Sequence, residues 1–179
     1  MTDVAQDIDD LFSMFHDVEI VGLDLKDEVL RMEILLPWCE MWGRERYSLT
    51  FELGGCKGVT CQYHVRTGNE VVRKDGKVFY PTDEYLTSDR HEIARLGLDV
   101  LGSSFDRPDR VTLHCERRIA SRDHEGVIEY AGIEFQTTSY RIFDDEMNEI
   151  SLDTMKGWAE EWWEGIQKMW DAQKPDGAE

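Results

Sequence analysis

Residues 47–65 read YSLTFELGGCKGVTCQYHV, and this stretch decides the fold. Apolar side chains alternate with polar ones from Tyr47 to Leu53, and the alternation resumes from Val59 to Val65. A period of two is typical of strands that bury one face. The stretch therefore predicts two strands joined by a short glycine-rich link. Such a link favours antiparallel pairing between them, because a parallel crossover needs a dozen or more residues.

The same alternation recurs on both sides of this stretch. It predicts strands at 21–25 and 30–36, joined as a hairpin by Lys26-Asp27-Glu28, and at 93–101, 111–115 and 130–142. Residues 93–101 fit either period, but Gly97 and Gly102 weaken a helix there. The long final stretch slips near Ala131-Gly132, as a bulge or bend requires. Residues 67–92 are rich in turn signals and predict loops with a small hairpin.

Two segments have helical spacing instead. Residues 3–15 carry an apolar stripe with aspartates between, which predicts a short amphipathic helix. A longer helix is predicted near the C-terminus, where Ser151 or Asp153 can cap it and Pro175 and Gly177 end it. Its apolar positions are Met155, Trp158, Trp162, Ile166 and Met169.

A chain of 179 residues and 20.9 kDa, with 41% hydrophobic residues, fits one folded domain over residues 1–179. The predicted fold class is α+β. We expect an antiparallel sheet of about seven strands, curved or arranged as a β-sandwich, with a short N-terminal helix and a long tryptophan-rich C-terminal helix.

The chain is strongly acidic, with 20 basic and 38 acidic residues and a formal net charge of −18. Residues 1–30 hold 9 acids and 1 base, residues 121–179 hold 15 acids and 5 bases, and the middle is neutral. This balance argues against nucleic acid and anionic membranes as partners and favours either a basic protein or simple solubility. The candidate partner contacts are Asp7, Asp9, Asp10, Asp144, Asp145, Glu146, Glu160, Glu161 and Glu164.

The C-terminal tryptophans suggest an alternative role. Trp158, Trp162 and Trp163 form a stripe wide enough to line a pocket for an apolar ligand between the sheet and the helix, although core packing explains such a stripe more simply. Trp38 and Trp42 lie in a predicted loop and are contact candidates if exposed.

No catalytic residue, metal site or cofactor is predicted. The four cysteines, Cys39, Cys56, Cys61 and Cys115, are too irregular for a disulfide framework and are expected to be reduced. A zinc site is disfavoured because strand alternation puts Cys61 and His64, like Cys115 and His114, on opposite faces. No nucleophile-elbow or phosphate-binding glycine motif occurs. The His16-Asp17 pair suits a metal or a proton shuttle, but a turn at a helix end explains it more simply.

The run from Phe15 to Ile20, together with Tyr47 to Cys56, resembles small, acidic, β-rich bacterial proteins, some of which look like immunity proteins of toxin systems. The resemblance covers the first third of the chain and implies a non-enzymatic inhibitor that binds a basic toxin through acidic residues. The N-terminus has neither the basic start nor the apolar stretch of a secretory signal, so we expect a cytoplasmic protein. The oligomeric state stays open.

Overall fold

The computed structural model describes residues 4–14, 18–36, 47–69, 71–72, 78–107, 110–117 and 127–173. Within these ranges the chain forms three helices and twelve strands, which confirms an α+β fold with a large antiparallel sheet. The helices are α1 (Val4–Ser13), α2 (Arg90–Arg95) and α3 (Leu152–Gln173). The strands are β1 (Val18–Lys26), β2 (Val29–Leu35), β3 (Ser48–Gly54), β4 (Val59–Arg66), β5 (Val71–Val72), β6 (Val78–Phe79), β7 (Thr82–Thr87), β8 (Asp99–Arg107), β9 (Arg110–Arg117), β10 (Ile128–Gln136), β11 (Ser139–Phe143) and β12 (Glu149–Ile150).

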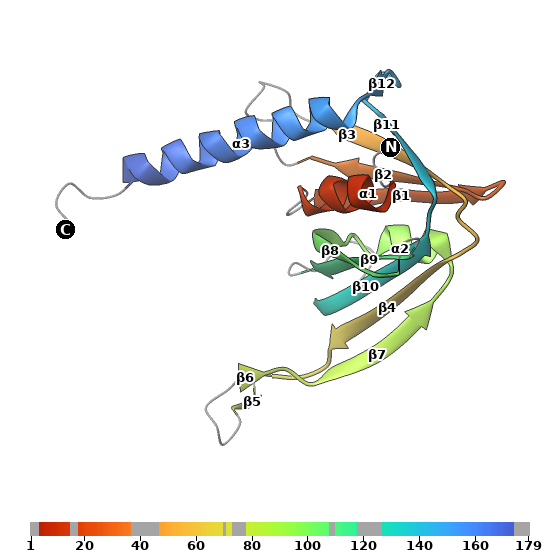
Figure 1. Ribbon diagram of the computed structural model, residues 1–179. Helices are drawn as coiled ribbons and strands as arrows, with labels where there is room; N and C mark the ends of the chain where they lie inside the picture. The colour runs from red at the N-terminus through yellow and green to blue at the C-terminus, as the bar shows by residue number, and fades with distance from the viewer. Residues whose placement is uncertain are drawn as a thin grey trace.

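Ten of the strands form one sheet in the order β12-β11-β3-β2-β1-β8-β9-β10-β4-β7, and β5 pairs with β6 in a separate ribbon. Figure 1 shows the sheet bent into two halves that face each other. Strands β12 to β1 make one half, and β8 to β7 make the other. The sheet is therefore strongly curved, and its two halves enclose the core.

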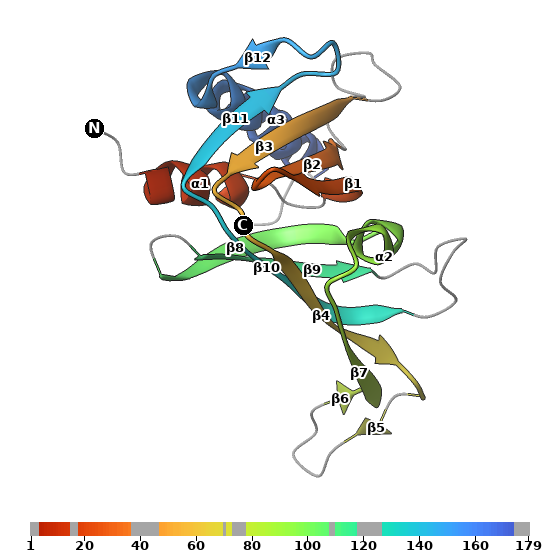
Figure 2. The same ribbon diagram turned by 90° about the vertical axis from the view of Figure 1, so that its right-hand side faces the viewer.

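Strand pairing and two crossings of the chain join the two halves of the sheet. Among the described strands, the two halves pair where β1 meets β8, through Val18↔Val100 and Glu19↔Asp99. The chain itself also crosses twice, from β3 to β4 and from β10 to β11, and Figure 2 shows these crossings near each other. The crossings contact directly, because the Thr138 amide donates to the Gly54 carbonyl at 2.9 Å.

Glycine is required where these crossings touch. Gly55 has a φ of 75°, a conformation that side chains with a Cβ rarely adopt. A Cβ added at Gly55 would lie 2.4 Å from Thr138 Oγ1, and one added at Gly54 would lie 2.3 Å from Ser139 Oγ. The Gly54-Gly55 pair therefore allows close approach of the two crossings, and the link from β3 to β4 is the strand connection that we expected.

Helix α1 belongs to the core and lies between the two half-sheets (Figure 1). The central part of its apolar stripe is covered, with Ile8, Leu11 and Phe12 no more than 1% exposed, while Val4 at its start is 36% exposed. The ring of Phe12 contacts Phe51 of β3 at 5.8 Å and Phe135 of β10 at 6.2 Å between centroids. Because these two strands belong to opposite halves, Phe12 connects them through apolar contacts.

Several local predictions are confirmed. The N-terminal and C-terminal helices form, and Ser151 caps α3 by accepting a hydrogen bond from the Thr154 amide at 3.1 Å. Strands β1 and β2 form the expected hairpin, whose two turn residues, Asp27 and Glu28, both have positive φ. The slip in β10 is also real, because its register with β9 shifts between Ile128 and Ala131.

The strand count was predicted too low. Strand β7 was missed because its side chains are exposed at nearly every position, so it lacks the alternation that marks a half-buried strand. The stretch 130–142 is two strands, separated at Thr137 and Thr138, rather than one. The short β12 adds a further strand at the opposite edge.

The prediction of a strand over residues 93–101 is wrong in its first part. Residues 90–95 form α2, because the Asp89 side chain accepts hydrogen bonds from the His91 and Glu92 amides and so caps a helix. Gly97, at a φ of 60°, then turns the chain into β8. The alternation was right only from Asp99 onward.

The predicted pairing of the strands at 47–53 and 59–65 is also wrong. Strand β3 pairs with β2 and β11, whereas β4 pairs with β10 and β7. The link between them is short enough for a hairpin, but it bends the chain from one half of the sheet to the other. The chain makes a second crossing between β10 and β11, so that β10 pairs with β4 in one half and β11 pairs with β3 in the other.

Candidate partner-binding surface

Helices α1 and α3 pack against each other and bring two of the predicted acidic segments together. The side chains of Asp7, Asp9 and Asp10 are partly exposed on the side of α1 that its apolar stripe leaves free. Helix α3 buries Met155 and Ala159, and next to them it carries Lys156 and Glu160. Asp10 of α1 and Glu160 of α3 therefore border one surface.

An ion pair joins the two helices at this surface. Lys156 Nζ of α3 lies 2.5 Å from Asp10 Oδ2 of α1, and both side chains are about one third exposed, at 38% and 33%. The hydrogen bond from Lys156, helped by one from Gln6, lowers the pKa of the Asp10 carboxyl. The same hydrogen bond raises the pKa of Lys156, with further contributions from Asp153 and Asp7.

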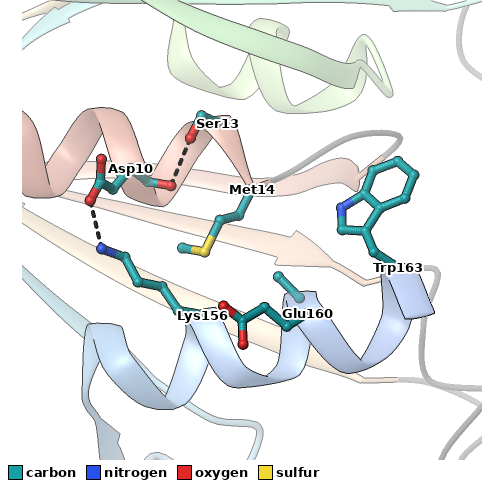
Figure 3. Close-up of a pocket in the computed structure, with 7 residues that line it drawn as sticks. Asp10, Ser13, Met14, Lys156, Glu160 and Trp163 are labelled. Carbon is teal, nitrogen blue, oxygen red and sulfur yellow. Dashed lines mark hydrogen bonds and ion pairs between the residues drawn. The ribbon is translucent and has the colours of Figure 1, made fainter. Parts of the chain in front are cut away.

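A pocket of about 330 Å³ lies beside this ion pair. Figure 3 shows Asp10, Ser13 and Met14 on the α1 side facing Lys156, Glu160 and Trp163 on the α3 side. The Trp163 ring is 45% exposed and stands at one end, so the pocket combines charged groups with an aromatic wall. It lies between two helices and not, as the alternative role assumed, between the sheet and α3.

The surface around the pocket has an excess of negative charge. Tyr140 donates to Asp7 Oδ2 at 3.3 Å, and the pKa of Tyr140 is raised by burial and by the nearby Asp7, Asp153 and Asp10. Glu160 and Glu164 follow Lys156 at four-residue intervals and so share its side of the helix. Glu164 pairs with Lys168 at 3.6 Å, and Glu161 is exposed beside it.

The three tryptophans proposed as a pocket lining lie in different surroundings. Trp158 packs edge-on against Tyr47 at 5.7 Å, and both Trp158 and Trp162 pack against the core. Trp162 contacts Trp163 at 4.5 Å between ring centroids. Of the three, Trp163 is the one that lines the pocket described above.

The third acidic segment lies on other elements, in the turn between β11 and β12. Asp144 Oδ1 accepts hydrogen bonds from the Glu146 amide at 3.0 Å and from the Asn148 amide at 2.7 Å. Its carboxylate therefore closes the turn, while the side chains of Asp145 and Glu146 are exposed. Arg31 of β2 contacts this turn through Met147 Sδ at 3.3 Å.

A second polar cluster, which the sequence did not predict, spans β8, β9 and β10. His114 Nε2 lies 2.8 Å from Ser104 Oγ, and His114 Nδ1 lies 3.3 Å from Tyr130 Oη. Gly132 of β10 pairs with His114 of β9. A Cβ added at Gly132 would lie 3.2 Å from Tyr130 Oη, so the glycine leaves room for the tyrosine hydroxyl. The His114 ring therefore links the Ser104 and Tyr130 hydroxyls in one chain of contacts.

The cysteines in the described ranges are buried and lie apart from the histidines. Cys61 and Cys115 face the core while His64 and His114 on the same strands are partly exposed, so the expected alternation is confirmed. Burial raises the pKa of Cys61 to about 12 and also raises the pKa of Cys56. In these ranges no three His, Cys, Asp or Glu side chains come close enough together to hold a metal ion.

Several earlier candidates lie outside the described residues, namely His16 and Asp17, Trp38, Cys39 and Trp42. None of the helices in the described part of the chain combines the length and apolar character needed to cross a membrane.

Comparison with known proteins gives no family for this chain. It matches no protein-family model, no curated protein and no solved structure.

Proposed function

We propose that the protein is a non-enzymatic binding protein whose acidic α1–α3 surface docks a basic protein. One observation carries this proposal: Lys156 pairs with Asp10 at 2.5 Å, and Glu160 lines the same pocket. Asp7 and Asp153 lie near enough to help raise the pKa of Lys156. The pairing leaves a local excess of carboxylates, which attracts a cationic surface.

An acidic surface would speed the association of this protein with a basic partner. Complementary charges steer two proteins together and raise the association rate, most strongly at low salt. The resemblance of residues 15–20 and 47–56 to immunity-like proteins supports a basic bacterial toxin as the class of partner, and inhibition of that toxin as the outcome.

The test compares two variants with the same change in charge. Glu160→Lys/Glu161→Lys alters the proposed surface, and Glu19→Lys/Glu33→Lys alters exposed positions on β1 and β2. Each immobilised protein is used to capture partners from the source lysate, with elution by a salt gradient and identification by mass spectrometry. Circular dichroism confirms that all variants are folded.

We expect one basic protein to be retained by the wild type and by the β1–β2 variant, and to be released by salt. The α3 variant should lose it, with an association rate at low salt reduced about tenfold or more. Equal capture by all three proteins, or capture of an acidic partner that salt does not release, would refute the proposal.

The pocket beside Trp163 supports a second candidate, a small-ligand-binding protein or an enzyme. Its aromatic wall suits an apolar group, while Lys156 and Glu160 provide polar contacts. The neutral dye N-phenyl-1-naphthylamine should then bind and quench tryptophan fluorescence. Binding should be lost in Trp163→Ala and kept in Val4→Ala, which changes an exposed residue on α1. No quenching in the wild type would exclude this role for apolar ligands.

A further inference from the structure

Strand β7 forms one edge of the ten-stranded sheet. It pairs with β4 along its whole length, from Cys61↔Thr87 to Arg66↔Thr82, without a register shift. No strand in the described ranges pairs with its other side. Figures 1 and 2 show β7 at the outer margin of the sheet. The backbone amides and carbonyls on that side therefore form a template for another strand.

Strand β7 has only part of the usual protection of an edge strand. Proteins block such edges with charged side chains, above all lysine, and with proline, bulges or very short strands. The charges on β7 are the acidic ones of Asp83 and Glu84, which repel acidic strands but not basic ones. The sequence of β7, TDEYLT, contains neither lysine nor proline, and its register is regular over six residues. The opposite edge, β12, is only two residues long and leads almost directly into α3. Of the two edges, β7 is the longer one, and within the described part of the chain no strand lies beyond it.

The side chains of β7 offer apolar contacts on both faces. Leu86 is 75% exposed and Tyr85 is 46% exposed, and as neighbours along a strand they point to opposite faces. The Tyr85 ring stacks on Tyr63 at 5.2 Å with an interplanar angle of 16°, which holds it in place at the edge. A strand added to β7 would cover apolar surface on each face of the sheet.

The charges on β7 indicate what kind of strand would bind. Asp83 and Glu84 are exposed, and Glu84 accepts a hydrogen bond from Gln62 of β4. A second copy of this chain would bring two molecules with a formal charge of −18 each into contact. A segment with lysine or arginine beside apolar residues instead complements both the carboxylates and the apolar side chains.

We propose that β7 is a docking edge for an extended basic segment of a partner protein, which adds to the sheet next to β7. The main-chain hydrogen bonds supply affinity, and alternate basic and apolar side chains supply specificity. This inference goes beyond the proposed function, because it rests on the sheet edge and not on the α1–α3 surface.

A peptide experiment tests the proposal on the full chain. The probe is a fluorescent, end-capped peptide of about eight residues that alternates lysine and valine, a length typical of one strand. A second peptide has the same sequence but carries N-methyl groups on alternate amides, so that it keeps the charges and cannot donate along one side. Fluorescence anisotropy measures the binding of each peptide to the wild type, to Leu86→Lys and to Thr60→Lys. Thr60→Lys is the control, because it adds the same charge at an exposed position on β4.

We expect the first peptide to bind wild type and Thr60→Lys alike, and Leu86→Lys about tenfold more weakly. The N-methylated peptide should bind none of them measurably. Equal binding of both peptides would show attraction by net charge alone and overturn the proposal, as would equal binding to wild type and Leu86→Lys. A concentration-dependent dimer that Leu86→Lys abolishes would identify a second copy as the occupant and also overturn it.

Discussion

The Thr137 hydroxyl lies 3.0 Å from the carbonyl oxygen of Gly54 and 2.9 Å from that of Ser139, at a position only 2% exposed. This contact joins the two places where the chain crosses between the halves of the sheet. In the ranges that the structure describes, strand pairing between the halves is limited to β1 and β8. The crossing is therefore a point where small changes should alter the stability of the whole fold.

Replacing Thr137 by valine should destabilise the protein by about 1–2 kcal/mol, because a buried hydroxyl loses its carbonyl partners while the shape is kept. Thr138→Val is the matched control. Thr138 is exposed and its hydroxyl lies 3.5 Å from the same carbonyl, so we expect a change of less than about 0.5 kcal/mol. Urea unfolding of the two variants measures the difference, and equal stabilities would contradict the role assigned to Thr137.

Alanine should have opposite effects at two glycines. Gly55→Ala forces a Cβ into a positive-φ position and against Thr138, and should cost roughly 1–3 kcal/mol. Gly157 is exposed within α3 with open space around it, so Gly157→Ala should stabilise by up to about 1 kcal/mol through helix propensity. Thermal unfolding distinguishes the two, and a neutral Gly55→Ala would show that the crossing can relax.

The Asp10–Lys156 pair predicts a defined pH dependence. The pKa of Asp10 is lowered from its ordinary value of 3.8, so its contribution to stability is present above that value and is lost as the pH falls through the lower, folded pKa. The pKa of Lys156 is raised from 10.5, so its contribution is lost only as the pH rises above that value. NMR titration should therefore give an Asp10 midpoint below 3.8 that moves upward in Lys156→Gln. An unchanged midpoint would mean that the ion pair does not form in solution.

The buried thiols should be unreactive in the native protein. Burial raises the pKa of Cys56, Cys61 and Cys115, and the thiolate is the reactive form. In a Cys39→Ser variant, which removes the cysteine outside the described residues, Ellman's reagent should find no fast-reacting thiol at neutral pH. Full reaction of the three thiols should appear only after denaturation. Rapid reaction of the native variant would show that the core opens readily.

Part of the candidate site was predictable from the sequence. Asp10 and Glu160 were both expected on acidic helix faces, since helical spacing assigns faces from neighbours a few residues apart. Their arrangement was not predictable. Lys156, which pairs with Asp10, lies 146 residues away in the sequence and carries no local signal. The same holds for Ser104, His114 and Tyr130, which the strand register alone brings together.

The sequence by itself determined the local elements of this protein: both amphipathic helices, the β1–β2 hairpin and most half-buried strands. These follow from the period of apolar residues and from turn chemistry, which act over a few positions. Only the tertiary structure decided that β3 and β4 separate, that β7 is an open edge and that α1 lies inside the curved sheet. These features depend on which distant strands pair, and the alternation of a strand fixes its buried face but not its neighbour.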